Sequence, residues 1–223
     1  MVKKLFLAIA LTAFAAGGLY ADSRWSIGGG LQTGLRSDEI LLRFPSPPFP
    51  PDGTADYFAL ETGVWGFVQA RFVGLSFALT SGPAWFNFDI PGLTGDLARG
   101  NVVALDLGLM LNLLTFGFPH GVAVFFSAGI GYNAVLLYGV WGETFTGRER
   151  HLDANTLSGR GGVGFDINIS EGMFLRSNFL FGLNILPSRD TREFLREMEE
   201  LGATTRGVVG MTAIFNFGVG FRL

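Results

Sequence analysis

The chain has 223 residues, 16 basic and 19 acidic side chains, a formal net charge of −3 and no cysteine. This balance excludes a basic nucleic-acid surface, and the missing cysteines exclude a disulfide framework and a thiolate metal site. Apolar residues make up 48% and charged residues 16%, whereas a soluble domain has about 25% charged residues. For a chain of one-domain length, this composition favours residence in a membrane.

The first 21 residues have the layout of a secretory signal peptide. Lys3 and Lys4 precede an apolar run from Leu5 to Ala16, and Ala21 supplies a small residue at the cleavage site. The run is short for a membrane-spanning helix, so we expect cleavage rather than an uncleaved anchor. The prediction is a signal peptide over residues 1–21 and a single domain over residues 22–223.

Eight later stretches alternate apolar side chains with polar or small ones, and this period of two is typical of strands. In 103–113 every odd position is Val or Leu, and Asp106 and Gly108 lie on the other face. The stretch 58–70 is less regular, because Trp65 and Phe67 fall on its polar face. The eight stretches, in chain order, are 25–35, 58–70, 73–81, 103–113, 122–136, 157–169, 173–185 and 209–223.

The connections between these stretches alternate in length. Three are short, at 71–74, 118–121 and 170–172, and four are longer, at about 37–57, 82–101, 137–156 and 186–207. Outer-membrane barrels have short periplasmic turns and longer external loops. The sequence therefore predicts an all-β fold, an eight-stranded antiparallel up-and-down transmembrane β-barrel in the cell outer membrane. Two alternatives remain: transmembrane helices over 102–118 and 122–141, and a soluble barrel with its apolar face inside.

The last eight residues resemble the C-terminal assembly signal of outer-membrane barrels. Asn216, Gly218 and Phe221 fall on its positions, and Leu223 occupies the final place, which is usually aromatic. The whole predicted domain is similar to small eight-stranded families, namely the OmpA membrane domain, OmpX and OmpW. The resemblance implies insertion by the barrel-assembly machinery into outer-membrane lipid, and a role in anchoring, adhesion or passage of small apolar molecules.

The polar faces of the strands carry charges that a closed barrel would enclose. We expect them to form a lumen ion-pair network, because a buried charge is costly unless it is paired. If Ile169 faces Met173 across the turn, Asp166 lies opposite Arg176 and the two form an ion pair, with Gly172 left-handed. We favour structural plugging of the lumen over conduction. The predicted lumen charges are Glu61, Asp106, Arg160, Asp166 and Arg176, with Arg222 near the periplasmic rim.

Two external loops are candidate ligand sites. Residues 44–51 form a stiff, proline-rich stretch that is either a rigid surface loop or a binding edge. Asp190 and Gly202 bracket a predicted helix, expected to pack over the barrel mouth or to lie in the headgroup layer. Its apolar stripe consists of Phe194, Leu195, Met198 and Leu201. The partner expected at these loops is a host molecule or a small-molecule ligand.

The residues give little support for catalysis, and we expect no enzyme, cofactor or metal site. His120 and His151 are predicted on opposite sides of the membrane, and the Gly159–Gly164 run that matches G-x-G-x-x-G lies inside a strand. The expected function is a surface-exposed or structural barrel, or a porin-like narrow path for small, including apolar, solutes. The alternatives are a lipid A-modifying enzyme using His151, near Asp153, and an adhesin acting through external loops 1 and 4.

Overall fold

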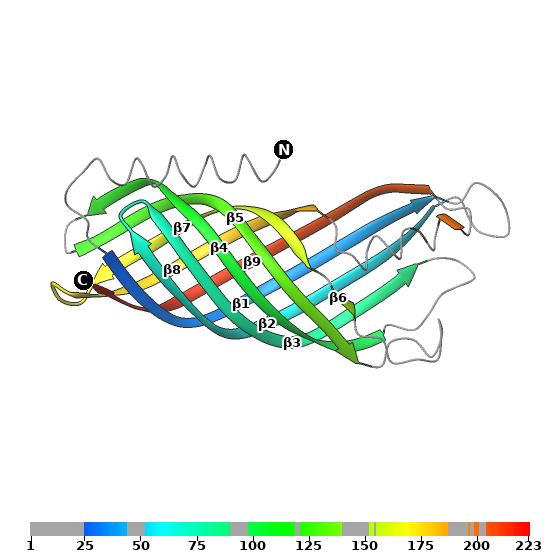
Figure 1. Cartoon of the computed structure of the whole chain (residues 1–223), viewed down its shortest axis with the longest axis horizontal. Helices are drawn as coiled ribbons and strands as arrows, with labels where there is room; N and C mark the ends of the chain where they lie inside the picture. Colours follow the sequence, from blue (N-terminus) through cyan, green and yellow to red (C-terminus); the bar gives the residue numbers. More distant parts are fainter. Residues whose placement is uncertain are drawn as a thin grey trace.

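The computed structural model describes residues 25–43, 52–89, 98–118, 121–139, 152–153, 155–186, 196, 199–200 and 204–223. Nearly all of these residues lie in β-strands (Figure 1). The strands are β1 (Trp25–Arg43), β2 (Asp52–Ala70), β3 (Val73–Asp89), β4 (Ala98–Phe118), β5 (Val122–Gly139), β6 (Leu152–Asp153), β7 (Thr156–Asn168), β8 (Met173–Leu186) and β9 (Thr204–Arg222).

The eight long strands form one closed antiparallel barrel, which confirms the predicted fold. Neighbours follow the order β4-β3-β2-β1-β9-β8-β7-β5, and β4 pairs with β5 to complete the circle. The two-residue β6 extends the β5 edge by pairing with Leu136 and Leu137. The helical alternative is wrong, because residues 102–118 and 122–139 are strands. Within the described ranges, no helix is long and apolar enough to cross a bilayer.

The strands are strongly staggered. Following directly paired residues once around the barrel from Ser26 returns to β1 at Arg36, ten residues further along. A stagger of this size tilts the strands, by about 35–45° in small barrels. The residues passed on the way are Gln69, Gly74, Met110, Gly129, Arg160, Gly182 and Thr212.

The start of β1 and the end of β9 lie at the same end of the barrel as the short turns, and we call this end the turn end. The Leu223 N–H donates to the Trp25 carbonyl oxygen there, with 2.8 Å between nitrogen and oxygen. The Ile169 N–H donates to the Met173 carbonyl oxygen at 2.9 Å, the register that the sequence predicts. The left-handed conformation expected at Gly172 is wrong: a positive φ occurs at Arg71 and Gly121 in the described chain. Both Ile169 and Ser170 donate to the Met173 carbonyl, which closes the turn without it.

At the opposite end β1, β3, β5 and β8 end and β2, β4, β7 and β9 begin, and we call it the loop end (Figure 1). Several strands reach far into segments that were expected to be loops, which corrects the predicted boundaries. In the first such segment, β1 runs to Arg43 and β2 begins at Asp52, with Asp38 still paired to Tyr57. Backbone pairing continues here after the side-chain alternation has stopped, so the period-two pattern underestimates strand length.

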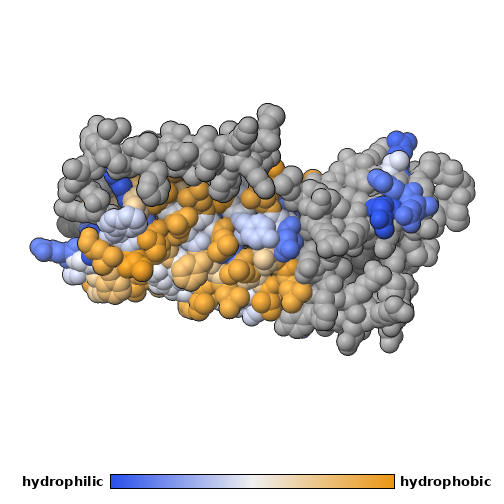
Figure 2. Space-filling model, viewed as in Figure 1, coloured by the Kyte–Doolittle hydropathy of each residue, from blue (hydrophilic) through white to orange (hydrophobic). Residues whose placement is uncertain are grey.

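The apolar faces of the strands point outward, and the polar faces point into the barrel. Phe179 is 48% exposed, whereas Asp106 is 4% exposed. Figure 2 shows apolar residues gathered over the middle of the barrel wall on the viewed face. Trp65 and Phe67, each 4% exposed, lie inside, as their place on the polar face of β2 indicates. The soluble-barrel alternative is therefore wrong, because that fold has the reverse arrangement.

Candidate functional site

The lumen holds the charges that the sequence predicts, and they form two separate networks. Glu61 on β2 belongs to a network nearer the loop end, which we call the upper network. Gln69, eight residues along the same strand, belongs to a lower network at the turn end. Trp65 and Phe67 lie on β2 between them and point into the lumen. An apolar layer therefore separates the two polar networks.

The first half of the upper network is the pair of Asp106 on β4 and Arg160 on β7. Arg160 Nη1 donates to Asp106 Oδ1 at 2.7 Å, and Nη2 donates to the second carboxylate oxygen. The same guanidinium donates to Asn133 Oδ1 at 2.7 Å and to Ser158 Oγ at 3.0 Å. Gly131 makes this placement possible, because a Cβ there would lie 2.0 Å from Arg160 Cζ.

The second half joins Arg36 on β1 to Glu61 on β2. Arg36 Nε donates to Glu61 Oε1 at 2.7 Å, and the Thr80 hydroxyl donates to Glu61 Oε2 at 2.7 Å. Asn133 Oδ1 also accepts from Arg36 Nη2 at 3.5 Å, which links the two ion pairs. Sequence reasoning missed Arg36 and Asn133 as members of this network. Arg36 continues the even-numbered inward face of the first stretch and could have been found by extending it one residue.

The lower network is centred on Arg176 of β8. Its guanidinium binds Asp166 through two hydrogen bonds of 2.7 and 2.6 Å, and donates to Gln69 Oε1 at 2.6 Å. Asp166 lies directly opposite Arg176 in the β7–β8 register, as the hairpin turn predicts. Three rings surround the same cation, with centroids of Phe67, Phe125 and Phe174 at 4.4, 4.9 and 5.1 Å from Arg176 Cζ.

Glycines on the neighbouring strands leave room for two of these rings. A Cβ on Gly164 would lie 2.1 Å from the Phe125 ring, and a Cβ on Gly220 would lie 2.3 Å from the Phe174 ring. The bidentate contact and the ring stack both use the planar guanidinium, which an ammonium could not reproduce. Arg176 and its partners therefore form a packed polar and aromatic seal at the turn end.

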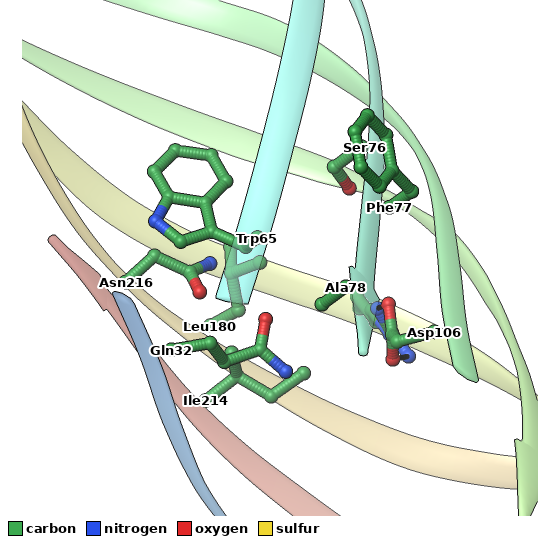
Figure 3. A pocket seen from close by; sticks show the side chains of 10 residues that line it. Gln32, Trp65, Ser76, Phe77, Ala78, Asp106, Leu180, Ile214 and Asn216 are labelled. Atoms are coloured by element: carbon green, nitrogen blue, oxygen red, sulfur yellow. Dashed lines mark hydrogen bonds and ion pairs between the residues drawn. The ribbon is translucent and has the colours of Figure 1, made fainter. Parts of the chain in front are cut away.

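The layer between the networks contains apolar side chains and one small cavity. Met110, Leu180 and Ile214 form a buried cluster there. Figure 3 shows the cavity beside Leu180 and Ile214, with Gln32 and Asn216 on one side and Asp106 on the other. The cavity has room for about one water molecule.

This arrangement is suited to closing the lumen rather than to conducting through it. Each arginine of the two networks is matched by a carboxylate at ion-pair distance, so the charges of these networks balance pairwise. The side chains of Arg160 and Asp106 are 1% and 5% exposed. Well-paired buried charges of this kind are held in place, because separating them leaves an uncompensated charge in a poorly solvated interior.

The remaining predicted residues are placed as follows. Asn216 and Gly218 point into the lumen from β9, whereas Phe221 points outward. Leu223 ends the chain beside β1, and Arg222 donates to Asn168 Oδ1 near the rim of the turn end. β9 pairs with both β1 and β8.

Several predicted features lie outside the described residues: the signal peptide, the proline-rich stretch 44–51, His120, His151, and the apolar stripe of Phe194, Leu195, Met198 and Leu201. Of the last loop, Arg196, Glu199 and Glu200 are described and are helical. Arg196 Nε lies 3.7 Å from Glu200 Oε1, as in an i,i+4 helix pair. Both side chains are well exposed, so the pair contributes little stability.

Comparison with known proteins finds similarity in structure but not in sequence. No protein-family model matches the chain, and no curated protein sequence matches it. The outer membrane protein OprG from Pseudomonas aeruginosa is similar with a TM-score of 0.48 and 14% identity, over 90% of this chain and 96% of that one.

Two further solved structures are similar at lower scores. The N-terminal β-barrel domain of Pseudomonas aeruginosa OprF has a TM-score of 0.33 and 15% identity, over 87% of this chain and all of that one (100%). Ail of Yersinia pestis, in complex with the heparin analogue sucrose octasulfate, has a TM-score of 0.36 and 14% identity, over 90% and 99% of the two chains. Similarities this low assign no activity to the chain.

Proposed function

We propose that this protein is a non-enzymatic outer-membrane β-barrel with a closed lumen, which acts through its lipid-embedded wall and its loop end. The observation that carries the proposal is the polarity of the wall: large apolar side chains are exposed on every long strand, while three ion pairs lie in the interior. A water-soluble protein exposing this much contiguous apolar surface would aggregate. In a bilayer the same surface is matched by hydrocarbon.

The height of the apolar wall supports a membrane-spanning position. On β9, outward apolar side chains run from Val209 to Phe221. At about 3.4 Å per residue and a tilt of about 40°, this segment spans about 30 Å along the barrel axis, close to the thickness of a bilayer's hydrocarbon core of about 30 Å. Towards the loop end of β1, outward Leu35 is followed by outward Ser37 and exposed Glu39, which marks the upper edge of the apolar band.

The two ends support an orientation with the turn end in the periplasm. Short periplasmic turns and longer external connections are the rule in bacterial outer-membrane barrels. The proposal places external loop 1, with its proline-rich stretch 44–51, and external loop 4 at the cell surface, where they could contact a host molecule or a small ligand. Insertion would require the barrel-assembly machinery, and outer-membrane lipid would be the partner of the apolar wall.

Planar-bilayer recording of the detergent-folded protein tests the closed lumen. We expect the folded barrel to insert, to migrate differently on gels before and after heating, and to show no steady ionic conductance. Arg176→Ala with Phe67→Ala removes the seal at the turn end, and this variant should also show no steady conductance, because the upper network still closes the lumen. Steady ionic current through the wild-type protein would refute a closed lumen, and failure to insert would refute membrane residence.

Passage of small apolar solutes is a second candidate, favoured by an interruption in the wall. The β2–β3 pairing is continuous except at Leu60–Glu61, opposite Gly82–Pro83, where Pro83 has no N–H to donate. The strands remain close there, since a Cβ on Gly82 would lie 1.9 Å from the Leu60 carbonyl oxygen, so passage requires them to part. Uptake of an apolar fluorophore into vesicles should fall in Pro83→Val if this path operates, and equal uptake would exclude it.

The absence of catalysis is also part of the proposal. The enzymatic alternative depends on His151 with Asp153 close in sequence. Lipid A from cells that make the wild-type protein should have the same mass as lipid A from cells that make His151→Ala. A mass difference that depends on His151 would contradict the proposal and identify an enzyme.

A further inference from the structure

Among the residues that the structure describes, four buried side-chain oxygen atoms in the lumen have no hydrogen-bond partner. All four lie on the adjacent strands β8 and β9: Asn178 Oδ1, Asn184 Oδ1, Thr212 Oγ1 and Asn216 Oδ1. Buried polar atoms in proteins are nearly always hydrogen-bonded, either to protein or to ordered water. Asn178 lies directly opposite Asn216, whereas Thr212 is four residues from Asn216 along β9. Each acceptor therefore calls for a donor besides the groups that already surround it.

One of these oxygens lies at the cavity between the two networks. Asn216 is 4% exposed and lines the cavity together with Gln32, Trp65 and Asp106 (Figure 3). In the strand register, Asn216 lies directly opposite Asn178 on one side and Gln32 on the other. Three amide side chains thus form a row across β8, β9 and β1, and two of them, Asn216 and Gln32, line the cavity.

The charges around the cavity favour a neutral ligand. Asp106 is the carboxylate in its lining, and Arg160, also in the lining, already neutralises it at ion-pair distance. A cation would have to compete with the guanidinium for Asp106, and an anion would have to compete with the carboxylate. Rotating the Asn216 amide by 180° would exchange an unpartnered acceptor for an unpartnered donor, and water can satisfy either one.

We propose that the cavity binds a single ordered water molecule, which donates a hydrogen bond to Asn216 Oδ1 and bridges it to the polar groups of Gln32 or the Asp106–Arg160 pair. The size of the space, the unpartnered acceptor and the balanced charge all fit water. The site hydrates the middle of the lumen without opening it, because Leu180 and Ile214 line the same cavity as apolar walls. The inference requires a closed barrel and is independent of whether that barrel resides in a membrane.

Crystals of the detergent-folded protein that diffract well enough to show single waters test this directly. We expect one peak of water density within hydrogen-bond distance of Asn216 Oδ1 in the wild-type protein. The peak should be lost in Asn216→Leu and retained in Asn168→Leu, a control amide at the turn end. A wild-type cavity without density would overturn the proposal, and so would a peak that gives an anomalous signal after rubidium soaking.

X-ray radiolytic labelling in solution provides a second readout that needs no crystal. Hydroxyl radicals formed from a bound water should oxidise Trp65, which lines the cavity, faster than Phe174, which is 1% exposed in the ring cluster around Arg176. The rates are compared after correction for intrinsic reactivity. Trp65 labelling should fall in Asn216→Leu and stay unchanged in Asn168→Leu. Equal protection of Trp65 and Phe174 in the wild-type protein would overturn the proposal.

Discussion

Replacing Arg160 with methionine tests whether the upper network is held in a water-poor interior. The substitution keeps most of the side-chain volume but removes the positive charge that faces Asp106. Both partners are nearly inaccessible, with side chains 1% and 5% exposed. Arg160→Met therefore leaves a buried carboxylate without its counter-ion and also removes the donors to Asn133 and Ser158.

The expected cost follows from the burial. Removing one partner of a buried ion pair lowers the free energy of unfolding by about 3–5 kcal/mol, whereas replacing both partners with apolar residues of similar size is often neutral or stabilising. We therefore expect Arg160→Met to be strongly destabilising and Asp106→Leu with Arg160→Met to recover most of that loss. Arg222→Met is the matched control, since Arg222 lies near the rim and should cost less than about 1 kcal/mol.

Urea unfolding of the detergent-folded barrel, followed by tryptophan fluorescence and by heat-modified gel migration, measures these differences. The reasoning would be refuted if Arg160→Met and Arg222→Met lost similar, small amounts of unfolding free energy. That result would mean that the lumen is solvated well enough to stabilise a lone carboxylate. A double variant as unstable as Arg160→Met would refute the idea that an unpaired charge causes the loss.

Three further substitutions give expected outcomes by the same unfolding assay. Gly131→Ala brings a methyl group to 2.0 Å from Arg160 Cζ and should lower the free energy of unfolding by about 1–3 kcal/mol. Its control, Gly117→Ala, has no atom within 4 Å of the new methyl group and should lower it by less than about 1 kcal/mol. Equal losses in the two variants would contradict the close packing at Gly131. Arg176→Lys keeps the positive charge but loses the two hydrogen bonds to Asp166 and the contact with the aromatic rings. We therefore expect the free energy of unfolding to fall by about 1–3 kcal/mol. A variant as stable as the wild-type protein would mean that the charge alone stabilises this network. Leu107→Arg in lipid vesicles should cost about 2–4 kcal/mol if Leu107, which is 45% exposed, faces the hydrocarbon core. Ser37→Arg, at the upper edge of the apolar band, should cost about 0–1 kcal/mol. A harmless Leu107→Arg would place that face outside the lipid.

The sequence predicts which residues of a strand share a face, because a period of two places alternate residues on opposite sides. The assignment held even where the residue types misled: Trp65 and Phe67 lie inside although both are large and apolar. Strand length could not be predicted in the same way. Between Asp38 and Tyr57 the backbone pairing continues, but the side chains there no longer alternate.

Some ion-pair partners could be predicted from the sequence, and others could not. Asp166 and Arg176 are ten residues apart within one hairpin, so the turn length alone gives their register. Arg160 is 54 residues from Asp106, and its partner follows from the stagger of the closed barrel rather than from any local pattern. Arg36 lies one residue beyond Leu35, where the predicted stretch ends, so the prediction does not include it.

The most direct test of the central claim is a site-directed spin-label scan along β8 of the protein in lipid vesicles. The claim is that outward side chains contact hydrocarbon while the interior is closed. Labels at Phe179 and Phe181 should be accessible to oxygen dissolved in the bilayer and protected from a water-soluble paramagnet, whereas a label at Leu180 should be protected from both. Oxygen access at Leu180 together with protection at Phe179 and Phe181 would contradict the account.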